Sequence, residues 1–186
     1  MSEYYRVNIA GMERNLLRCP LNDKLDIAAF IIFGDVELTV HCAAELLKRA
    51  PEYDYMIAPE AKAIPLIYEM ARQSGADKYF VARKGVKAYM TNALEVEVKS
   101  ITTANKQTLV IDEPDAMLMK GKRILVVDDV ISTGASSRAV ADLVENFGGI
   151  VVGYATPVAE GDAFNRDDII ALAQLPVFNP DGSVKG

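Results

Sequence analysis

The sequence predicts an α/β protein with a mostly parallel central sheet flanked by helices. Short apolar runs alternate with segments of helical periodicity, a pattern that is typical of βαβ units. The chain has 186 residues, a length that suits a single domain. Its residues are 51% hydrophobic and 25% charged, which is an ordinary composition for a protein with one large core.

The first half of the chain predicts two helices and two strands. A helix is expected from Asp35, whose carboxylate would cap it, to about Arg49. The apolar run at 53–58 favours a strand, and the stretch 63–75 has helical periodicity with a proline in its first turn. A second strand is expected at 78–82.

The second half begins with an unusual stretch. Residues 83–113 alternate between apolar and polar side chains in two places, which predicts an antiparallel hairpin standing off the sheet. A buried strand follows at 123–127, then a helix at 136–149 and a strand at 150–158. The tail, 167–186, is expected to fold back over the body of the protein.

Composition argues against several classes of function. The net charge of −6 and the pI of about 4.9 disfavour a nucleic-acid partner. The two cysteines, Cys19 and Cys42, and the one histidine, His41, form no metal-ligand pattern, so we expect free thiols and no metal held by the protein alone. Neither a signal peptide nor an apolar run of about 18 to 20 residues is present, which predicts a cytoplasmic protein without a membrane partner.

The stretch RILVVDDVISTGASS, residues 123–137, carries the strongest functional pattern. Two adjacent carboxylates, Asp128 and Asp129, end a strand that leads through a small-residue loop into a helix. Such a loop exposes backbone N–H groups at the positive end of the helix dipole, which is a phosphate site. The residues expected to hold the phosphate are Ser132, Thr133, Gly134, Ala135 and Ser136, with a further hydroxyl on Ser137.

The paired carboxylates require a different part of the same ligand. They can accept hydrogen bonds from the neighbouring hydroxyls of a ribose, while the loop binds the phosphate of that sugar. An ATP-type P-loop is disfavoured because its lysine is absent, and a dinucleotide fingerprint because only Gly134 is present. A phospho-receiver domain would place its acidic pair near its start. We therefore predict a ribose 5-phosphate site, with Asp128 and Asp129 as its central residues.

ILVVDDVISTGAS, residues 124–136, closely resembles the phosphoribosyl pyrophosphate motif of the type I phosphoribosyltransferases. The resemblance extends over about residues 30–160. Within the family, YFVARKGVKAYM (79–90) and VVGYATPVAEG (151–161) look most like the adenine members and then the xanthine members. The resemblance implies one phosphoribosyltransferase domain, 1–186. It also implies a small hood from about 1–34 and 160–186, and a mobile antiparallel flap at about 87–111.

The resemblance also implies a pyrophosphate site. Family members hold pyrophosphate in a loop after an early strand, often with a cis peptide bond, and residues 58–65 occupy that place here. Between Lys78 and Lys106 there are six basic residues against two acidic ones, which independently favours an anionic ligand. The pyrophosphate-binding residues so predicted are Glu60, Ala61, Lys62, Ala63, Arg83, Lys84, Lys87 and Lys106.

The implied reaction transfers a 5-phosphoribosyl group from phosphoribosyl pyrophosphate to a purine base in purine salvage, with Mg²⁺ bound through substrate and water and a homodimer as the assembly. Glu160 lies where xanthine-type relatives carry a lysine, which favours adenine, and Leu21 is the other predicted base contact. Adenine members carry a flap glutamate, whereas this chain has Thr103 or Asn105 near that position. Two alternatives stay open: a non-catalytic sensor of phosphoribosyl pyrophosphate, and a transferase for xanthine, hypoxanthine or a pyrimidine.

Overall fold

A six-stranded parallel sheet forms the centre of the computed structural model, which describes residues 3–98 and 107–185. Its strands, in spatial order, are β11 (Ile169–Leu175), β10 (Ile150–Glu160), β8 (Arg123–Val127), β4 (Tyr55–Pro59) and β5 (Phe80–Ala82), with β9 (Val130–Ile131) beside β10. Every pairing in this sheet is parallel. The predicted fold class is therefore confirmed.

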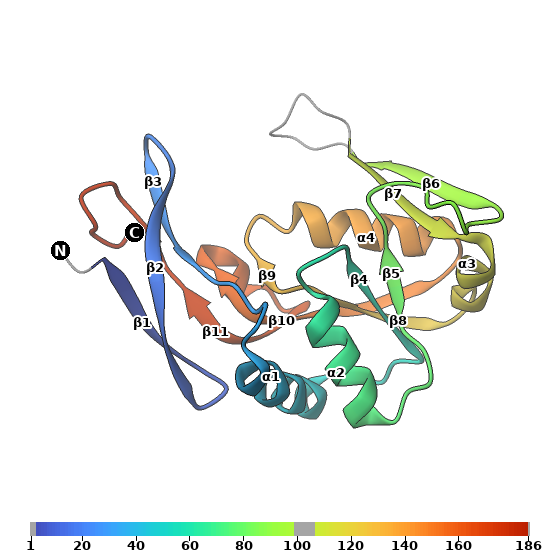
Figure 1. The fold of residues 1–186 in the computed structure, drawn as a ribbon, viewed down its shortest axis with the longest axis horizontal. Helices are drawn as coiled ribbons and strands as arrows, with labels where there is room; N and C mark the ends of the chain where they lie inside the picture. The colour runs from blue at the N-terminus through green and yellow to red at the C-terminus, as the bar shows by residue number, and fades with distance from the viewer. Residues whose placement is uncertain (1–2, 99–106, 186) are drawn as a thin grey trace.

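Helices cover both faces of this sheet (Figure 1). They are α1 (Val36–Arg49), α2 (Ile64–Ser74), α3 (Glu113–Met119) and α4 (Ala135–Asn146). Alternate residues of β8 show the two faces, since Leu125 and Val127 pack in the core formed with α1 and α2, whereas Ile124 and Val126 pack with α3 and α4. Within the described residues, no helix has the length and hydropathy needed to cross a bilayer.

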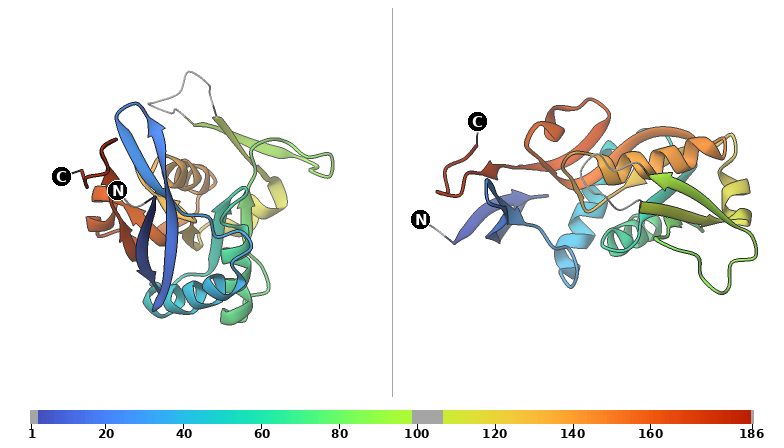
Figure 2. Two further views of the ribbon diagram at one scale, coloured as in Figure 1. Left: turned by 60° about the vertical axis from the view of Figure 1, so that its left-hand side comes forward. Right: turned by 90° about the horizontal axis from the view of Figure 1, so that it is seen from above.

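A second, antiparallel sheet joins the two ends of the chain. It consists of β1 (Tyr4–Ile9), β2 (Met12–Asn22), β3 (Leu25–Ala29) and β12 (Val177–Phe178), in that order. Val7, Ile9 and Leu16 on its inner face share a core with α1, so this terminal sheet is fixed to the parallel sheet. Figures 1 and 2 both show it projecting beyond the end of the parallel sheet nearest to β11.

The predicted antiparallel hairpin is also present. Its strands, β6 (Ala93–Val98) and β7 (Gln107–Asp112), pair only with each other in a two-stranded sheet, in the part of the chain that the structure describes. One β-bridge joins the hairpin to the segment after β5, since the main chains of Arg83 and Val110 exchange two hydrogen bonds of 2.8 Å. Leu109 and Ile111 of β7 are also buried in the core with α3 and α4. The short helix α3 follows directly and was not predicted.

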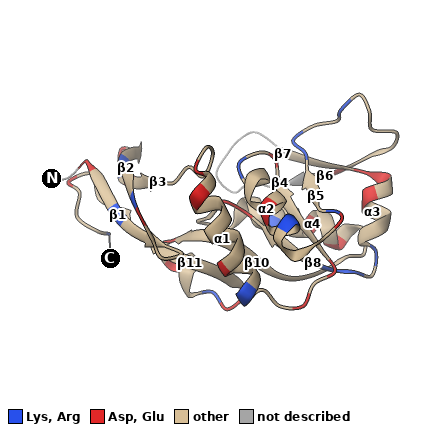
Figure 3. Ribbon diagram, turned by 60° about the horizontal axis from the view of Figure 1, so that its bottom comes forward, with Lys and Arg blue, Asp and Glu red and all other residues tan. Residues whose placement is uncertain are grey.

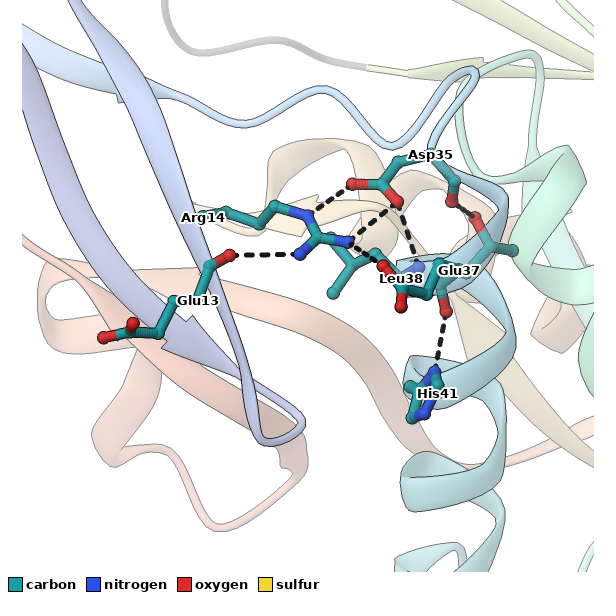
Figure 4. A network of polar contacts seen from close by, with 7 residues as sticks. Glu13, Arg14, Asp35, Glu37, Leu38 and His41 are labelled. Atoms are coloured by element: carbon teal, nitrogen blue, oxygen red, sulfur yellow. Dashed lines mark hydrogen bonds and ion pairs between the residues drawn. The ribbon is translucent and has the colours of Figure 1, made fainter.

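An ion-pair network fixes the terminal sheet to α1 (Figure 4). The Arg14 side chain of β2 donates from Nε to Asp35 Oδ2 at 2.6 Å and from Nη2 to Oδ1 at 3.0 Å. The same Oδ1 accepts the main-chain N–H of Leu38 at 3.0 Å, so Asp35 caps α1 as predicted. The Arg14 guanidinium and this N–H together hold the pKa of Asp35 below its usual range.

Replacing Asp35 with alanine should lower the free energy of unfolding by about 1–2 kcal/mol, because the cap and the ion pair are lost together. Since the folded-state pKa of Asp35 is lowered, its contribution is present above the unfolded pKa of about 3.9 and is lost as the pH falls through the folded value. Urea denaturation at pH 7 and pH 3 measures both effects. The exposed Arg6–Glu13 pair provides the control, because Glu13→Gln should change stability by less than about 0.5 kcal/mol. Equal losses in the two variants would contradict the assignment.

Candidate functional site

The carboxyl edge of the parallel sheet brings the predicted ligand-binding loops together. From β4 the chain passes through α2 to β5 on one side, and from β8 it passes through α4 to β10 on the other. The chain therefore leaves β4 toward one edge of the sheet and β8 toward the other. Open α/β sheets bind ligands at such a point, beyond the carboxyl ends of the two central strands. The 60–63 turn follows β4, and Asp128 follows β8.

The two adjacent carboxylates are buried at this point. Asp128 is 5% exposed and Asp129 is 8% exposed. The main-chain N–H of Asp128 donates to the Ala155 carbonyl at 3.0 Å, and that of Asp129 donates to Asp128 Oδ1 at 2.9 Å. Among the described residues, Oδ2 of Asp129 has no hydrogen-bond donor. Because buried polar atoms are normally satisfied, this oxygen is suited to accept a hydrogen bond from a ligand hydroxyl.

The electrostatics of the pair connect it to the loop after β4. Burial raises the pKa of both carboxyls, and the charge of Asp129 raises that of Asp128 further. The positive charge of Lys62 acts in the opposite direction and lowers the pKa of each. Lys62 therefore lies close enough to stabilise the ionised pair, although the two loops are far apart in the sequence.

The loop from β9 to α4 has the conformation of an anion site. Gly134 caps α4 with φ +78° and ψ +7°, a left-handed conformation that glycine adopts at little cost. The 12-residue helix then directs its first N–H groups and its positive dipole end toward the loop. The exposed residues here are Ser132, Thr133, Ala135 and Ser136. The hydroxyl of Ser137 is instead buried and donates to the Gly134 carbonyl at 3.2 Å, so it stabilises the loop.

The loop after β4 is tied to the basic segment after β5. Glu60 Oε2 accepts the main-chain N–H of Lys84 at 3.0 Å, while Oε1 lies 3.3 Å from Arg83 Nη2 and 3.8 Å from Lys87 Nζ. The Lys84 N–H and these cations lower the pKa of Glu60. The Glu60–Ala61 peptide bond is cis, as the family resemblance implies. Lys and Arg residues, among them those in the segment after β5, are blue in Figure 3.

The cations differ in their surroundings. Lys62 is exposed in the turn before α2, and Ala63 beside it is buried. The Nε of Arg83 is buried and has no acceptor within residues 3–98 and 107–185, so an anion can satisfy it. Lys106 is the one predicted pyrophosphate contact that lies outside the described residues, as do the flap positions Thr103 and Asn105.

A cavity of about 740 Å³ extends from the loop between β9 and α4 to the terminal sheet. Leu21 and Glu160, the two predicted base contacts, both line it together with Ser132 and Thr133. Its size is within the range of small-molecule sites. The other lining residues are Tyr5, Leu25, Ile27, Gly161, Asp162, Ala163, Gln174, Pro176, Val177, Val184 and Lys185.

The cavity wall combines an apolar side with a few polar groups. Glu160 ends β10, and burial raises the pKa of its carboxyl. Gln174 of β11 donates from Nε2 to the Gly161 carbonyl at 3.0 Å, which fixes the neighbouring turn. The sequence analysis missed Gln174 and Lys185 because neither belongs to a local motif. The parallel pairing of Glu160 with Leu175 is what brings β11 to the site.

Comparisons with known proteins agree with this geometry. Residues 40–173 match the family of the Phosphoribosyl transferase domain. An adenine phosphoribosyltransferase of Petrotoga mobilis is 29% identical over 153 residues, covering 79% of this chain and 72% of that protein. An orotate phosphoribosyltransferase of Caldanaerobacter subterraneus is 32% identical over 109 residues, covering 59% of this chain but only 46% of the relative.

The fold is similar to that of a solved structure. A crystal structure of adenine phosphoribosyltransferase from Thermoanaerobacter pseudethanolicus superimposes with a TM-score of 0.62 and 26% sequence identity, covering 77% of this chain and 84% of that one. The family match, residues 40–173, includes the loops after β4, β5 and β8, whereas β1–β3 and β12 of the terminal sheet lie outside it. The wall of the cavity that these strands form therefore lies outside the family match.

Proposed function

The chain belongs to the phosphoribosyltransferase family, as the sequence predicted, and we propose that this enzyme transfers the 5-phosphoribosyl group of phosphoribosyl pyrophosphate to adenine in purine salvage. The products are adenosine monophosphate and pyrophosphate. Relatives named adenine phosphoribosyltransferase, including the Petrotoga protein, support the base. The observation that carries the proposal is the buried Asp128–Asp129 pair, which has an unsatisfied carboxylate oxygen beside an anion-binding loop.

The three parts of phosphoribosyl pyrophosphate fit three parts of the site. The 5-phosphate binds the N–H groups and hydroxyls of 132–136, and the ribose hydroxyls donate to Asp128 and Asp129. The pyrophosphate lies between the 60–63 turn and the basic segment after β5, where the unsatisfied Nε of Arg83 supports an anion. Glu60 is then a residue that orders these cations, because its own carboxylate already contacts Arg83 and Lys87.

The reaction is displacement at the anomeric carbon. A ring nitrogen of the base forms a bond to this carbon as the bond to the pyrophosphate oxygen breaks, and the N–H proton of the base passes to the departing pyrophosphate or to water. The site accelerates it by holding both reactants in line and by placing Lys62 and Arg83 against the negative charge of the leaving group. No covalent intermediate on the protein is required.

The site also fits Mg²⁺ bound together with the substrate. The described residues include no cluster of three His, Cys, Asp or Glu side chains that could hold a metal ion by themselves. Mg²⁺ would instead be held by the pyrophosphate and water, and the free oxygen of Asp129 would accept a hydrogen bond from a ribose hydroxyl or from one of these waters. When bound, Mg²⁺ would neutralise part of the charge on the leaving pyrophosphate.

The smaller sheets take the roles that the resemblance implies. The terminal sheet, together with the turn after β10, forms the hood over the base, within about 1–34 and 160–186. The β6–β7 hairpin, within 87–111, is the flap whose closure excludes water from the activated ribose. Leu21 of β2 packs on the base, and Glu160 accepts a hydrogen bond from its amino or N–H groups.

The cavity disfavours the alternative bases. Orotate is an anion, and xanthine presents oxo groups, whereas Glu160 and Asp162 both line the cavity with the single cation Lys185, among the residues described. Carboxylates repel an anionic or oxo-bearing edge. A sensor without turnover is disfavoured because residues 40–173 match a transferase domain and the relatives are named as transferases.

Glu160→Gln should raise the KM for adenine by about tenfold, a loss that corresponds to one hydrogen bond to a charged group. Glu160→Lys should shift the preference toward oxo-bearing purines. Neither change should alter the KM for phosphoribosyl pyrophosphate. Steady-state kinetics with adenine, hypoxanthine and xanthine measure the effect, with Glu52→Gln on the opposite edge as the control. Unchanged base preference in both Glu160 variants would refute its role.

Turnover with a panel of bases tests the proposed function. The protein is incubated with phosphoribosyl pyrophosphate, Mg²⁺ and each of adenine, hypoxanthine, xanthine, guanine, uracil and orotate, and pyrophosphate release is measured. We expect release with adenine and formation of adenosine monophosphate. If pyrophosphate is released with a different base and not with adenine, that base is the substrate instead. Binding of phosphoribosyl pyrophosphate without turnover of any base would favour the sensor.

A cytoplasmic homodimer is the state that we propose for the enzyme. Both cysteines, Cys19 and Cys42, are free thiols, which suits a reducing compartment. Apolar side chains are exposed on α1, on α2 and on the connection before α1, and a second copy of the chain can bury them. These residues are Ile31, Phe33, Val36, Val40 and Tyr68. The net charge of −6 supports the prediction that nucleic acid is not a partner.

A further inference from the structure

We propose that Arg166 positions the phosphate loop and adds a positive charge behind it, and that this role determines how tightly the enzyme holds the phosphate of its ligands. The inference rests on the proposed function. Arg166 follows the short 3-10 helix η1 (Gly161–Asn165), outside every motif that the sequence analysis identified.

The guanidinium of Arg166 occupies the space that a side chain at position 134 would need. A Cβ atom built on Gly134 would lie 2.7 Å from Arg166 Nη1 and 3.9 Å from its Cζ. Real Cβ atoms essentially never approach another heavy atom this closely, so a side chain at position 134 would displace the guanidinium, which is the far end of a flexible side chain. The loop that should bind the phosphate is thus packed directly against a cation.

Three contacts hold this guanidinium in place. Its Nε and Nη2 donate to the two oxygens of Asp168 at 3.0 and 2.7 Å, and its Cζ lies 5.7 Å from the centre of the Tyr154 ring. Tyr154 is 5% exposed on β10, and its main-chain N–H donates to the Asp168 carbonyl at 2.9 Å. Side chain and main chain together therefore fix Arg166 to the parallel sheet.

The two edges of the guanidinium face different partners. Asp168 engages the edge that carries Nε and Nη2, so the Nη1 end is the one turned toward Gly134. Within the described residues Nη1 has no acceptor. The negative charge of Asp168 is on the far edge, and the near edge of the pair is positive. A phosphate in the loop therefore gains attraction from Arg166, and the loop keeps the shape that its N–H groups need.

Ligands with and without a phosphate separate this role from a general effect on folding. We expect Arg166→Ala to weaken binding of adenosine monophosphate and of ribose 5-phosphate by about 10- to 30-fold, the range for one charge-assisted interaction. Binding of adenine and adenosine, which carry no phosphate, should stay within about twofold. Arg166→Lys keeps the charge but not the two-point contact with Asp168, and should give an intermediate loss.

Arg123→Ala is the matched control. Arg123 also forms a two-point pair with an aspartate, Asp54, and its side chain is 41% exposed against 42% for Arg166, but it lies at the amino-terminal end of β8. This variant should bind all four ligands as the wild type does. Calorimetry measures the affinities, and thermal unfolding shows whether each variant is folded. If Arg166→Ala does not fold, Arg166→Lys carries the test.

A double-mutant cycle with Gly134→Ala tests the direct contact. Because a Cβ at position 134 and Arg166 Nη1 cannot share the same space, the loss of phosphate affinity caused by Gly134→Ala should be smaller in the Arg166→Ala background. Additive losses, or normal phosphate affinity in a folded Arg166 variant, would overturn the inference and leave the proposed function standing. A wild-type protein that binds neither phosphorylated ligand would instead remove the proposed function itself.

Discussion

The Asp128→Asn/Asp129→Asn double variant should lose nearly all turnover and gain thermal stability. Each carboxylate is expected to hold a ribose hydroxyl through a hydrogen bond to a charged group, worth about 1.5–3 kcal/mol, so the two together account for roughly a 10²- to 10⁴-fold loss. Substitution of a residue that serves ligand binding at a cost in stability is expected to lower activity and raise stability.

The gain in stability follows from the titration of the pair. Burial and the neighbouring charge raise the folded-state pKa of Asp128 to about 8, well above its unfolded value. Its contribution to folding is therefore complete below about pH 4 and is lost as the pH rises toward that folded value. The melting temperature of the double variant should exceed that of the wild type by several degrees at neutral pH, and the two should converge in acid.

Asp142→Asn supplies a control on the same side of the sheet. Asp142 is on α4, is paired with Arg138 and is 46% exposed, so its replacement should leave turnover unchanged and alter stability by less than about 0.5 kcal/mol. Thermal unfolding between pH 4 and pH 9 and pyrophosphate release measure both properties. Normal turnover of the double variant would exclude the pair from ribose binding, and earlier melting at neutral pH would show that the pair has a structural role instead.

Lys62→Gln should raise the KM for phosphoribosyl pyrophosphate and the inhibition constant of pyrophosphate by about 10- to 100-fold, because one charge-assisted contact to the leaving group is lost. The KM for adenine should not change. The same substitution removes the charge that lowers the pKa of Asp128 and Asp129, so both should titrate at a higher pH. The pH profile of turnover should then move toward alkaline pH, since the proposed mechanism requires the ionised pair.

Lys48 of α1 offers a comparison for Lys62. It is 67% exposed and pairs with Glu45, away from the carboxyl edge of the sheet. Lys48→Gln should leave all kinetic constants and the pH profile as they are. Product inhibition by pyrophosphate is the sharpest assay, because it measures the leaving group directly. Equal inhibition of wild type and Lys62→Gln would exclude Lys62 from the pyrophosphate site.

Local patterns in the sequence were sufficient for β4, β5, β8 and β10 of the central sheet and for the turn that leads into α4, but not for β9 and β11. β8 begins and ends where the apolar run 123–127 predicts, and Asp35 caps α1 as predicted. Strand, acidic pair, loop and helix are continuous in the chain, so their geometry is set by neighbours in sequence. The same holds for Gly134, whose left-handed conformation starts α4.

Features that depend on distant contacts could not be predicted. The pairing of β3 with β12 joins segments at opposite ends of the chain, and no local periodicity indicates it. The seven residues of α3 are too few for a clear helical pattern. Arg166 reaches Gly134 only because β10 and β11 are adjacent and parallel, which brings the turn between them over the start of α4. The cavity, lined by six separated segments, is hidden from the sequence for the same reason.

A crystal structure of the protein with adenosine monophosphate tests the central claim most directly. We expect the 5-phosphate on the main-chain N–H groups of 132–136, the two ribose hydroxyls on Asp128 and Asp129, and the base in the cavity between Leu21 and Glu160. Nucleotide bound elsewhere on the molecule, or bound here with its phosphate away from this loop, would contradict the account.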